Sequence, residues 1–317
     1  MSLSLELKKF INSEHIGGYV DITLNTDYDE AELSRPRKKG RNEDDRRSSR
    51  GGERVKVHYI EEGNGEPLIL VHTVGQSLYT WRNIFENLSK YYRVIAVDLL
   101  GHGYSDRPYS FNYTIEEQAE MIRLFMDAMG IESSHFLAFS MGSAYVMRLA
   151  FTNPERIGRI ILISPGGVTP EMPLPIRLID SPFLGVFACR MFGVKTVENV
   201  LSDAFFDLTN ITPELVKEYY GPISDPDARL ALRLSLSGYD DETLIKKFRT
   251  MNAEVLILLG SEDKWRPRES VEIYHAALKN ASVSIVRNAG HIIQEEKPDR
   301  VVAATLEYIP VIMPDIE

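Results

Sequence analysis

The sequence lacks several features that define large classes of protein. Only one of its 317 residues, Cys189, is a cysteine, which excludes an internal disulfide framework and fits a reducing compartment. No apolar run approaches the roughly 18 residues that a membrane-spanning helix needs. The segment from Met1 to Asn12 lacks the apolar core of a signal peptide. We therefore expect a cytoplasmic protein that makes no stable insertion into a membrane.

An excess of positive charge is also missing. The formal net charge is −10, whereas a protein that contacts nucleic-acid phosphates needs a basic face. No group of residues has the spacing of a metal site, and no glycine-rich loop fits a phosphate or dinucleotide. Cys189 lies in an apolar stretch with no histidine nearby in the sequence, which favours a small buried residue over a nucleophile. We expect no nucleic-acid partner, no metal and no cofactor.

Short apolar segments alternate regularly with amphipathic ones. Two alternating segments, 19–25 and 54–61, predict a pair of antiparallel strands. The later segments predict buried strands over 68–72, 94–99, 136–139, 160–164, 255–259 and 283–287, and helices over 79–91, 115–129, 144–151, 270–279 and 300–309. Near-continuous apolar strands separated by helices are typical of a mostly parallel sheet covered on both faces, which is an α/β fold.

Three segments lie outside this alternation. Residues 1–18 predict an amphipathic helix, because the apolar residues near its start fall on one face. Residues 26–53 are highly charged and almost free of apolar residues, which predicts a flexible loop. Residues 166–250 are helical and rich in proline, methionine and aromatic residues. They separate the two parts of the core, 19–165 and 251–317, so we expect a helical cap above the carboxyl ends of the strands, where ligands bind in such sheets.

Ser140 follows a predicted strand and immediately precedes a predicted helix. The segment Ala138-Phe139-Ser140-Met141-Gly142 has the spacing of the nucleophile elbow G-x-S-x-G, with alanine in the first glycine position. Small flanking residues are needed because a sharp strand-to-helix turn brings them against neighbouring backbone. Ser140 is therefore a candidate nucleophile.

A serine nucleophile requires a base, and the base requires an acid that orients it. His291 follows the last strand, at the sheet edge where Ser140 also lies, while His72 ends a strand and remains a possible accessory. Asp263 follows the strand 255–259 at the same edge. Asp98 also ends a strand, but its sequence favours a carboxylate that organises a loop. We therefore predict Ser140, Asp263 and His291 as a catalytic triad.

The chain resembles the α/β-hydrolase superfamily. The resemblance rests on the triad order and on the segments 70–75, 98–105, 138–142, 260–263 and 290–291. It implies an eight-stranded, mostly parallel sheet flanked by helices, with a cap inserted after the sixth strand. It also implies an oxyanion hole formed by the backbone N–H groups of Met141 and Val74. Thr73 stands where this family usually has glycine, so its hydroxyl is either an additional donor or an obstruction of the hole.

The resemblance implies a serine hydrolase of the carboxylesterase type that forms an acyl-enzyme on Ser140. Similarity to the branches that form an alkyl ester, such as haloalkane dehalogenases, would require aspartate at this position. The apolar cap favours a small to medium hydrophobic ester, lactone or thioester as substrate. Three alternatives stay open: a carbon–carbon bond hydrolase, a cofactor-free perhydrolase, and a ligand receptor that signals through its lid.

Overall fold

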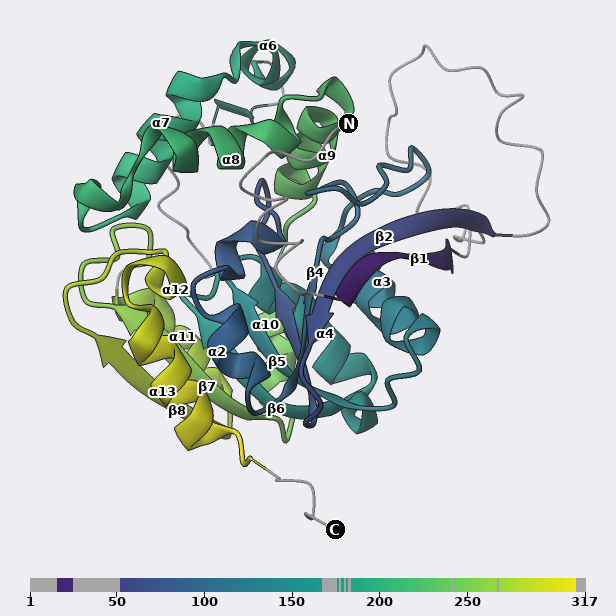
Figure 1. Ribbon diagram of the computed structural model, residues 1–317, viewed down its shortest axis with the longest axis vertical. Coiled ribbons are helices and arrows are strands. Elements are labelled where there is room, and N and C mark those ends of the chain that lie inside the picture. Colours follow the sequence, from purple (N-terminus) through teal and green to yellow (C-terminus); the bar gives the residue numbers. More distant parts are fainter. Residues whose placement is uncertain are drawn as a thin grey trace.

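A twisted eight-stranded sheet forms the centre of the molecule in the computed structural model (Figure 1). The structure describes residues 16–24, 52–166, 176, 178–179, 181, 184–240, 242–266 and 268–311. The strands are β1 (Ile16–Leu24), β2 (Glu53–Glu62), β3 (Pro67–Val71), β4 (Arg93–Val97), β5 (Ser134–Phe139), β6 (Ile157–Ile163), β7 (Glu254–Gly260) and β8 (Asn280–Val286). Their order in the sheet is β1-β2-β4-β3-β5-β6-β7-β8. The pairs β1–β2 and β2–β4 are antiparallel and the other five pairs are parallel, so the predicted mostly parallel sheet is confirmed.

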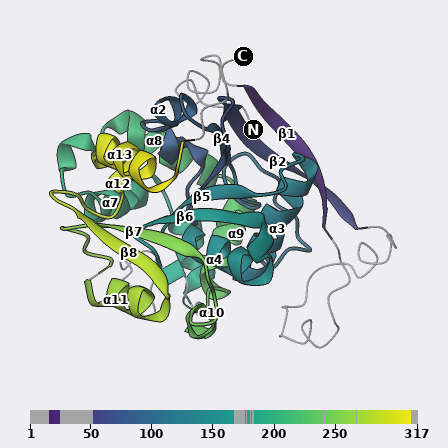
Figure 2. The same ribbon diagram turned by 90° about the horizontal axis from the view of Figure 1, so that it is seen from below.

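Helices cover both faces of this sheet (Figure 2). On one face lie α3 (Ile115–Ala128), α4 (Gly142–Thr152), α10 (Glu242–Phe248) and α11 (Arg268–Ala277); on the other lie α2 (Phe85–Ser89), α12 (Ile293–Glu296) and α13 (Pro298–Tyr308). Alternate residues of β3 enter the two cores: Ile69 and Val71 pack on the first face, Leu68 and Leu70 on the second. A strand buried on both faces must be apolar throughout, which explains the unbroken run in the sequence.

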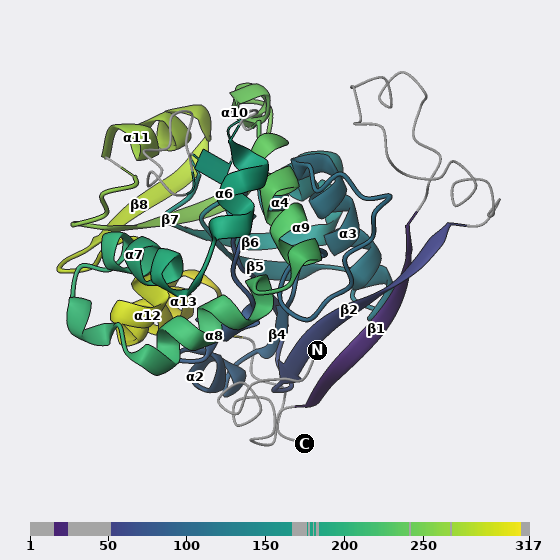
Figure 3. The ribbon, with the colours of Figure 1, turned by 90° about the horizontal axis from the view of Figure 1, so that it is seen from above.

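Further helices lie between β6 and β7 in the chain. They are α6 (Gly185–Met191), α7 (Val194–Ala204), α8 (Pro213–Ile223) and α9 (Pro226–Ser237). These four helices gather on one side of the molecule, over the carboxyl ends of the parallel strands (Figures 1 and 3). Within the predicted cap segment 166–250, α10 differs, because it packs on α4 and α11 with the core. The centroids of the Phe248 ring on α10 and the Tyr274 ring on α11 lie 5.3 Å apart.

Several element boundaries differ from the sequence-based predictions. The helix predicted over 79–91 is two short pieces, the 3-10 turn Leu78–Trp81 and α2. All four residues of the turn are buried, whereas an amphipathic helix exposes one face, so tertiary contacts rather than helical period decide this segment. β1 begins at Ile16, so the boundary placed at residue 18 is wrong. The rest of the predicted amino-terminal helix and charged loop lies outside the described residues, apart from residues 52–53.

Candidate active site

Ser140 is held in a strained turn between β5 and α4. Its φ of 51° lies in the left-handed region, which is uncommon for a residue with a side chain and typical of a functional constraint. The Ser140 N–H donates to the Ile163 carbonyl at 2.9 Å, which fixes the turn to β6. A Cβ atom on Gly142 would lie 2.3 Å from the His72 carbonyl oxygen, so only glycine fits the second small position of the elbow.

Ser140, His291 and Asp263 form a connected set of side chains. The His291 Nε2 atom lies 3.1 Å from the Ser140 hydroxyl oxygen, and His291 Nδ1 lies 2.9 Å from Asp263 Oδ2. All three residues are buried, with Ser140 5% exposed. With the proton on Nδ1, His291 donates to the carboxylate and its Nε2 accepts from the serine hydroxyl. The structure thus brings together the three residues that the sequence analysis selected.

The loops that carry the acid and the base approach each other closely. A Cβ atom on Gly260 would lie 2.1 Å from the Gly290 carbonyl oxygen, so the strand end before Asp263 touches the loop before His291. Burial would raise the pKa of the Asp263 carboxyl, but the charge and hydrogen bond of His291 outweigh it and lower this pKa below its usual range. The N–H groups of Trp265 and Arg266 also donate to Asp263 Oδ1, at 2.9 and 3.0 Å. Asp263 is therefore held as a carboxylate.

Asp98, the rival acid, lies in a different network. Its carboxylate accepts from His58 Nδ1 at 2.8 Å and from the Leu78 and Tyr104 N–H groups at 2.7 and 2.9 Å. These contacts join β2, the turn after β3 and the loop after β4, as expected of a loop-organising carboxylate. His72 is fully buried, with Nδ1 2.7 Å from the Thr73 carbonyl oxygen and Nε2 accepting from the Leu99 N–H at 3.0 Å. Burial lowers the pKa of His72, and neither ring nitrogen is free for a proton transfer.

Thr73 contacts the amide that the sequence analysis assigned to the oxyanion hole. The Met141 N–H donates to Thr73 Oγ1 at 3.2 Å. Thr73 starts a turn in which the Gln76 N–H donates to its carbonyl at 3.3 Å, and Gly75 has the positive φ of 72° that a type II turn requires. Thr73 itself is absent from the described non-glycine residues with positive φ, so a β-branched residue fits there without backbone strain. No described residue accepts a hydrogen bond from its hydroxyl.

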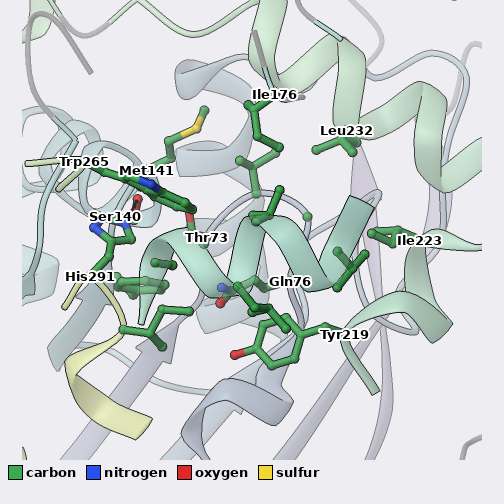
Figure 4. A pocket seen from close by; sticks show the side chains of 18 of the residues that line it. Thr73, Gln76, Ser140, Met141, Ile176, Tyr219, Ile223, Leu232, Trp265 and His291 are labelled. Carbon is green, nitrogen blue, oxygen red and sulfur yellow. Dashed lines mark hydrogen bonds between the residues drawn. The ribbon is translucent and has the colours of Figure 1, made fainter. Parts of the chain in front are cut away.

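A largely apolar cavity opens above Ser140, with Ser140, Thr73 and His291 on its wall (Figure 4). The space in it that a water-sized probe can occupy is about 100 Å³. The core contributes the polar groups of its wall, while the helices between β6 and β7 contribute apolar side chains: Phe192, Val197, Val200, Leu201, Ala204, Tyr219, Ile223, Leu232 and Leu236. Val74 and Met141, the predicted hole residues, also line it.

Two neighbouring carboxylates on α12 join the core to these helices. Glu296 accepts from the Gly290 N–H at 2.6 Å, and from the Phe206 and Asp207 N–H groups, each at 2.9 Å. Glu295 pairs with Arg82 at 2.7 Å and also accepts from the Tyr219 hydroxyl. In addition, the His291 N–H donates to the Ala204 carbonyl at 2.7 Å. The loop that carries His291 is therefore held partly by the end of α7 and the residues that follow it.

Sequence reasoning did not identify Trp265 and Arg266 as site residues. The Trp265 ring contacts the His291 imidazole in a tilted arrangement, with ring centroids 4.7 Å apart and an interplanar angle of 43°. Both residues line the cavity. The available signal was their position two and three residues after Asp263, on a loop at the functional edge of the sheet. Among the described residues, no cluster of metal-ligating side chains occurs, and no helix is long and apolar enough to cross a membrane.

Comparison with known proteins gives a consistent result. A family model described as alpha/beta hydrolase fold matches residues 66–298. The chain is 28% identical to a 2-hydroxy-6-oxo-6-phenylhexa-2,4-dienoate hydrolase of Comamonas testosteroni, over 80% of this chain and 91% of that protein. It is 24% identical to a haloalkane dehalogenase of Agrobacterium fabrum, over 78% of this chain and 86% of that one. A solved meta-cleavage product hydrolase of Pseudomonas fluorescens superposes with a TM-score of 0.69 at 26% identity, covering 80% of this chain and 94% of that chain.

Proposed function

Because this chain belongs to the α/β-hydrolase fold family, we propose that it is a serine hydrolase that forms an acyl-enzyme on Ser140. The observation that carries the proposal is the continuous set of contacts from Ser140 Oγ through His291 to Asp263, at 3.1 and 2.9 Å. This is the arrangement that activates a serine, because the imidazole takes the proton while the carboxylate stabilises the resulting imidazolium. The serine distinguishes the reaction from alkyl transfer to a carboxylate.

The reaction runs in two halves. Ser140 Oγ attacks the substrate carbonyl carbon and His291 Nε2 takes the hydroxyl proton, which gives a tetrahedral intermediate with a negative oxygen. His291 returns the proton to the leaving group as its bond to the acyl carbon breaks. Water, deprotonated by His291, then attacks the ester carbon of the acyl-enzyme and releases the acid and Ser140. Asp263 orients His291 in both halves.

The oxyanion would be stabilised by the N–H groups of Met141 and Val74, together with the Thr73 hydroxyl. Met141 is the N-cap residue of α4, where the helix dipole favours negative charge. The Thr73 oxygen accepts the Met141 N–H, so its own hydrogen points elsewhere, and Thr73 lies on the cavity wall. That hydrogen is available to the carbonyl oxygen of a bound substrate. We therefore assign Thr73 as a donor and not as an obstruction.

The cavity supports the proposed substrate class. Its apolar wall favours a small to medium hydrophobic ester, lactone or thioester over a peptide or a sugar polymer. Covalent labelling tests the nucleophile most directly. A fluorophosphonate should add one equivalent of mass to the full-length protein and none to the Ser140→Ala variant. An unchanged mass of the wild-type protein, or equal labelling of the variant, would contradict the assignment.

Hydrolysis of a carbon–carbon bond is a second candidate, favoured by the similarity to the Comamonas and Pseudomonas hydrolases. The same serine, base and acid would serve, with a carbon leaving group protonated in place of an alkoxide. Parallel turnover assays separate the two candidates: p-nitrophenyl butyrate for ester hydrolysis, and 2-hydroxy-6-oxo-6-phenylhexa-2,4-dienoate for carbon–carbon cleavage. Turnover of either compound would also exclude a receptor that only binds its ligand.

A further inference from the structure

Arg266 is a buried cation whose guanidinium has few hydrogen-bond partners among the described residues. The residue is 3% exposed. Its Nη1 group donates to the Trp265 carbonyl at 2.9 Å, whereas its Nε group is buried and has no hydrogen-bond partner. Asp263, three residues earlier, forms its ion pair with His291, and the charge of Arg266 only contributes to lowering the Asp263 pKa. Within the described part of the chain, Arg266 forms no ion pair at all.

Such an arrangement is costly for the folded protein alone. Removing a guanidinium from water is unfavourable unless an anion or several acceptors replace the lost hydration. Tertiary contacts do not supply them here, because one neutral carbonyl is the only acceptor found for the guanidinium among the described residues. The described residues therefore leave the Arg266 Nε donor without an acceptor.

The position of Arg266 shows where that acceptor would lie. Arg266 lines the same cavity as Ser140 and His291, and the side chains that α7 contributes to this cavity are apolar. Its backbone N–H donates to Asp263 Oδ1 at 3.0 Å, and the ring of the preceding Trp265 contacts that of His291. The residue is thus fixed to the loop of the catalytic acid. A guanidinium presents N–H donors in a planar fork that matches a carboxylate, and the surrounding apolar wall strengthens such a pair.

We propose that Arg266 binds a carboxylate of the substrate, so that the natural ligand is an apolar acyl compound with a second, anionic end. This inference deepens the proposed function, since it names the substrate class of the same cavity. The apolar part of the ligand would contact the side chains of α7 and α8, while its carboxylate would pair with the guanidinium. A neutral hydrophobic ester would leave Arg266 without an anion and would bind less tightly.

Binding to the full chain carrying Ser140→Ala tests the inference without any turnover. Isothermal titration would compare 4-phenylbutyrate with 4-phenylbutanamide, which has nearly the same shape and no charge. We expect the carboxylate to bind about 10- to 100-fold more tightly, the range for a hydrogen-bonded charge. Adding Arg266→Gln should remove this preference, and Arg266→Lys should keep part of it because the positive charge remains.

Arg233 provides a matched control, because its Nε is also buried without a partner but the residue is not among those that line the cavity. Arg233→Gln should keep the preference for the carboxylate. The inference is overturned if the two probes bind equally, if the carboxylate fails to bind, or if the preference persists in Arg266→Gln. A protein that shows this preference but fails the fluorophosphonate test would refute the serine hydrolase and leave the anion site standing.

Discussion

The Thr73 hydroxyl offers the sharpest test of how this site stabilises charge. Thr73→Val replaces the hydroxyl by a methyl group of similar size, which removes both the acceptor for the Met141 N–H and the donor toward the cavity. In the ligand-free protein the 3.2 Å contact joins two neutral groups, so its loss costs only about 0.5–1.5 kcal/mol of stability. Against a developing oxyanion the same donor counts for more, about 2.7–4 kcal/mol.

The difference between these two magnitudes predicts the kinetic result. We expect Thr73→Val to lower kcat on p-nitrophenyl butyrate by roughly 100-fold, with a small change in KM, because the interaction strengthens mainly in the transition state. Thr73→Ser keeps the hydroxyl and should remain within a few-fold of the wild type. Thermal unfolding of each variant checks that the fold is preserved.

Thr73→Gly decides between a donor and an obstruction. It removes the hydroxyl and also opens the space above the Met141 N–H. If the hydroxyl is a donor, Thr73→Gly should lose activity as Thr73→Val does. If the hydroxyl instead occupies the place of the oxyanion, removing it should raise kcat above that of the wild type. Activity of Thr73→Gly at or above the wild-type level would refute the reasoning.

Three further predictions concern the carboxylates. Asp263→Asn should keep the fold and lower kcat by up to about 10⁴-fold, the effect seen in the best-studied triad. Asp98→Asn should instead lower the free energy of unfolding by about 3–5 kcal/mol in a denaturant titration. The reverse pattern would mean that Asp98 is the catalytic acid and Asp263 the structural one. Glu296→Gln should destabilise the protein by about 1.5–3 kcal/mol and increase hydrogen exchange at Phe206, because it weakens the carboxylate that accepts three N–H groups; unchanged exchange there would contradict the proposed link. Burial alone would raise the pKa of Asp98, but the contacts with His58 lower this pKa. The contribution of Asp98 to stability is therefore complete above the ordinary aspartate pKa of about 3.9 and is lost as pH falls through the lower folded value. In Asp98→Asn the free energy of unfolding should fall less steeply with decreasing pH than in the wild type, and an identical pH dependence would contradict this prediction.

The sequence was sufficient to select Ser140, Asp263 and His291 because a parallel sheet imposes their proximity. Each residue follows the carboxyl end of a strand, and β5, β6, β7 and β8 are neighbours in the sheet. Residues far apart in the chain are thereby brought to one edge. The apolar character of the strands is a consequence of burial on both faces, so strand positions could also be predicted. The boundaries of helices were harder to predict where tertiary contacts outweigh the helical periodicity of apolar residues, as in the turn Leu78–Trp81.

Contacts between loops could not be predicted in the same way. The Thr73 hydroxyl and the Met141 N–H are 68 positions apart, and their contact depends on the turn at Gly75 and on the strained torsion of Ser140. Neither torsion is encoded by an apolar pattern. The burial of Arg266 could not be predicted either, because an arginine in a loop is ordinarily solvated. Only the packing in the structure shows that this side chain is buried.

Thr73 and Arg266 together define what a ligand must supply. The Thr73 hydroxyl has a hydrogen without an acceptor among the described residues, and the Arg266 Nε group has none either. Both residues line one apolar cavity, so a ligand that satisfies them carries two acceptors separated by an apolar body. A carbonyl oxygen at Thr73 places the scissile carbon beside Ser140, and a carboxylate at Arg266 then fixes the other end. The two contacts should affect different kinetic constants. The substrate carboxylate is charged from the start, so its pair with Arg266 forms in the ground state and should govern KM. The Thr73 hydrogen bond strengthens as the oxyanion develops, so it should govern kcat.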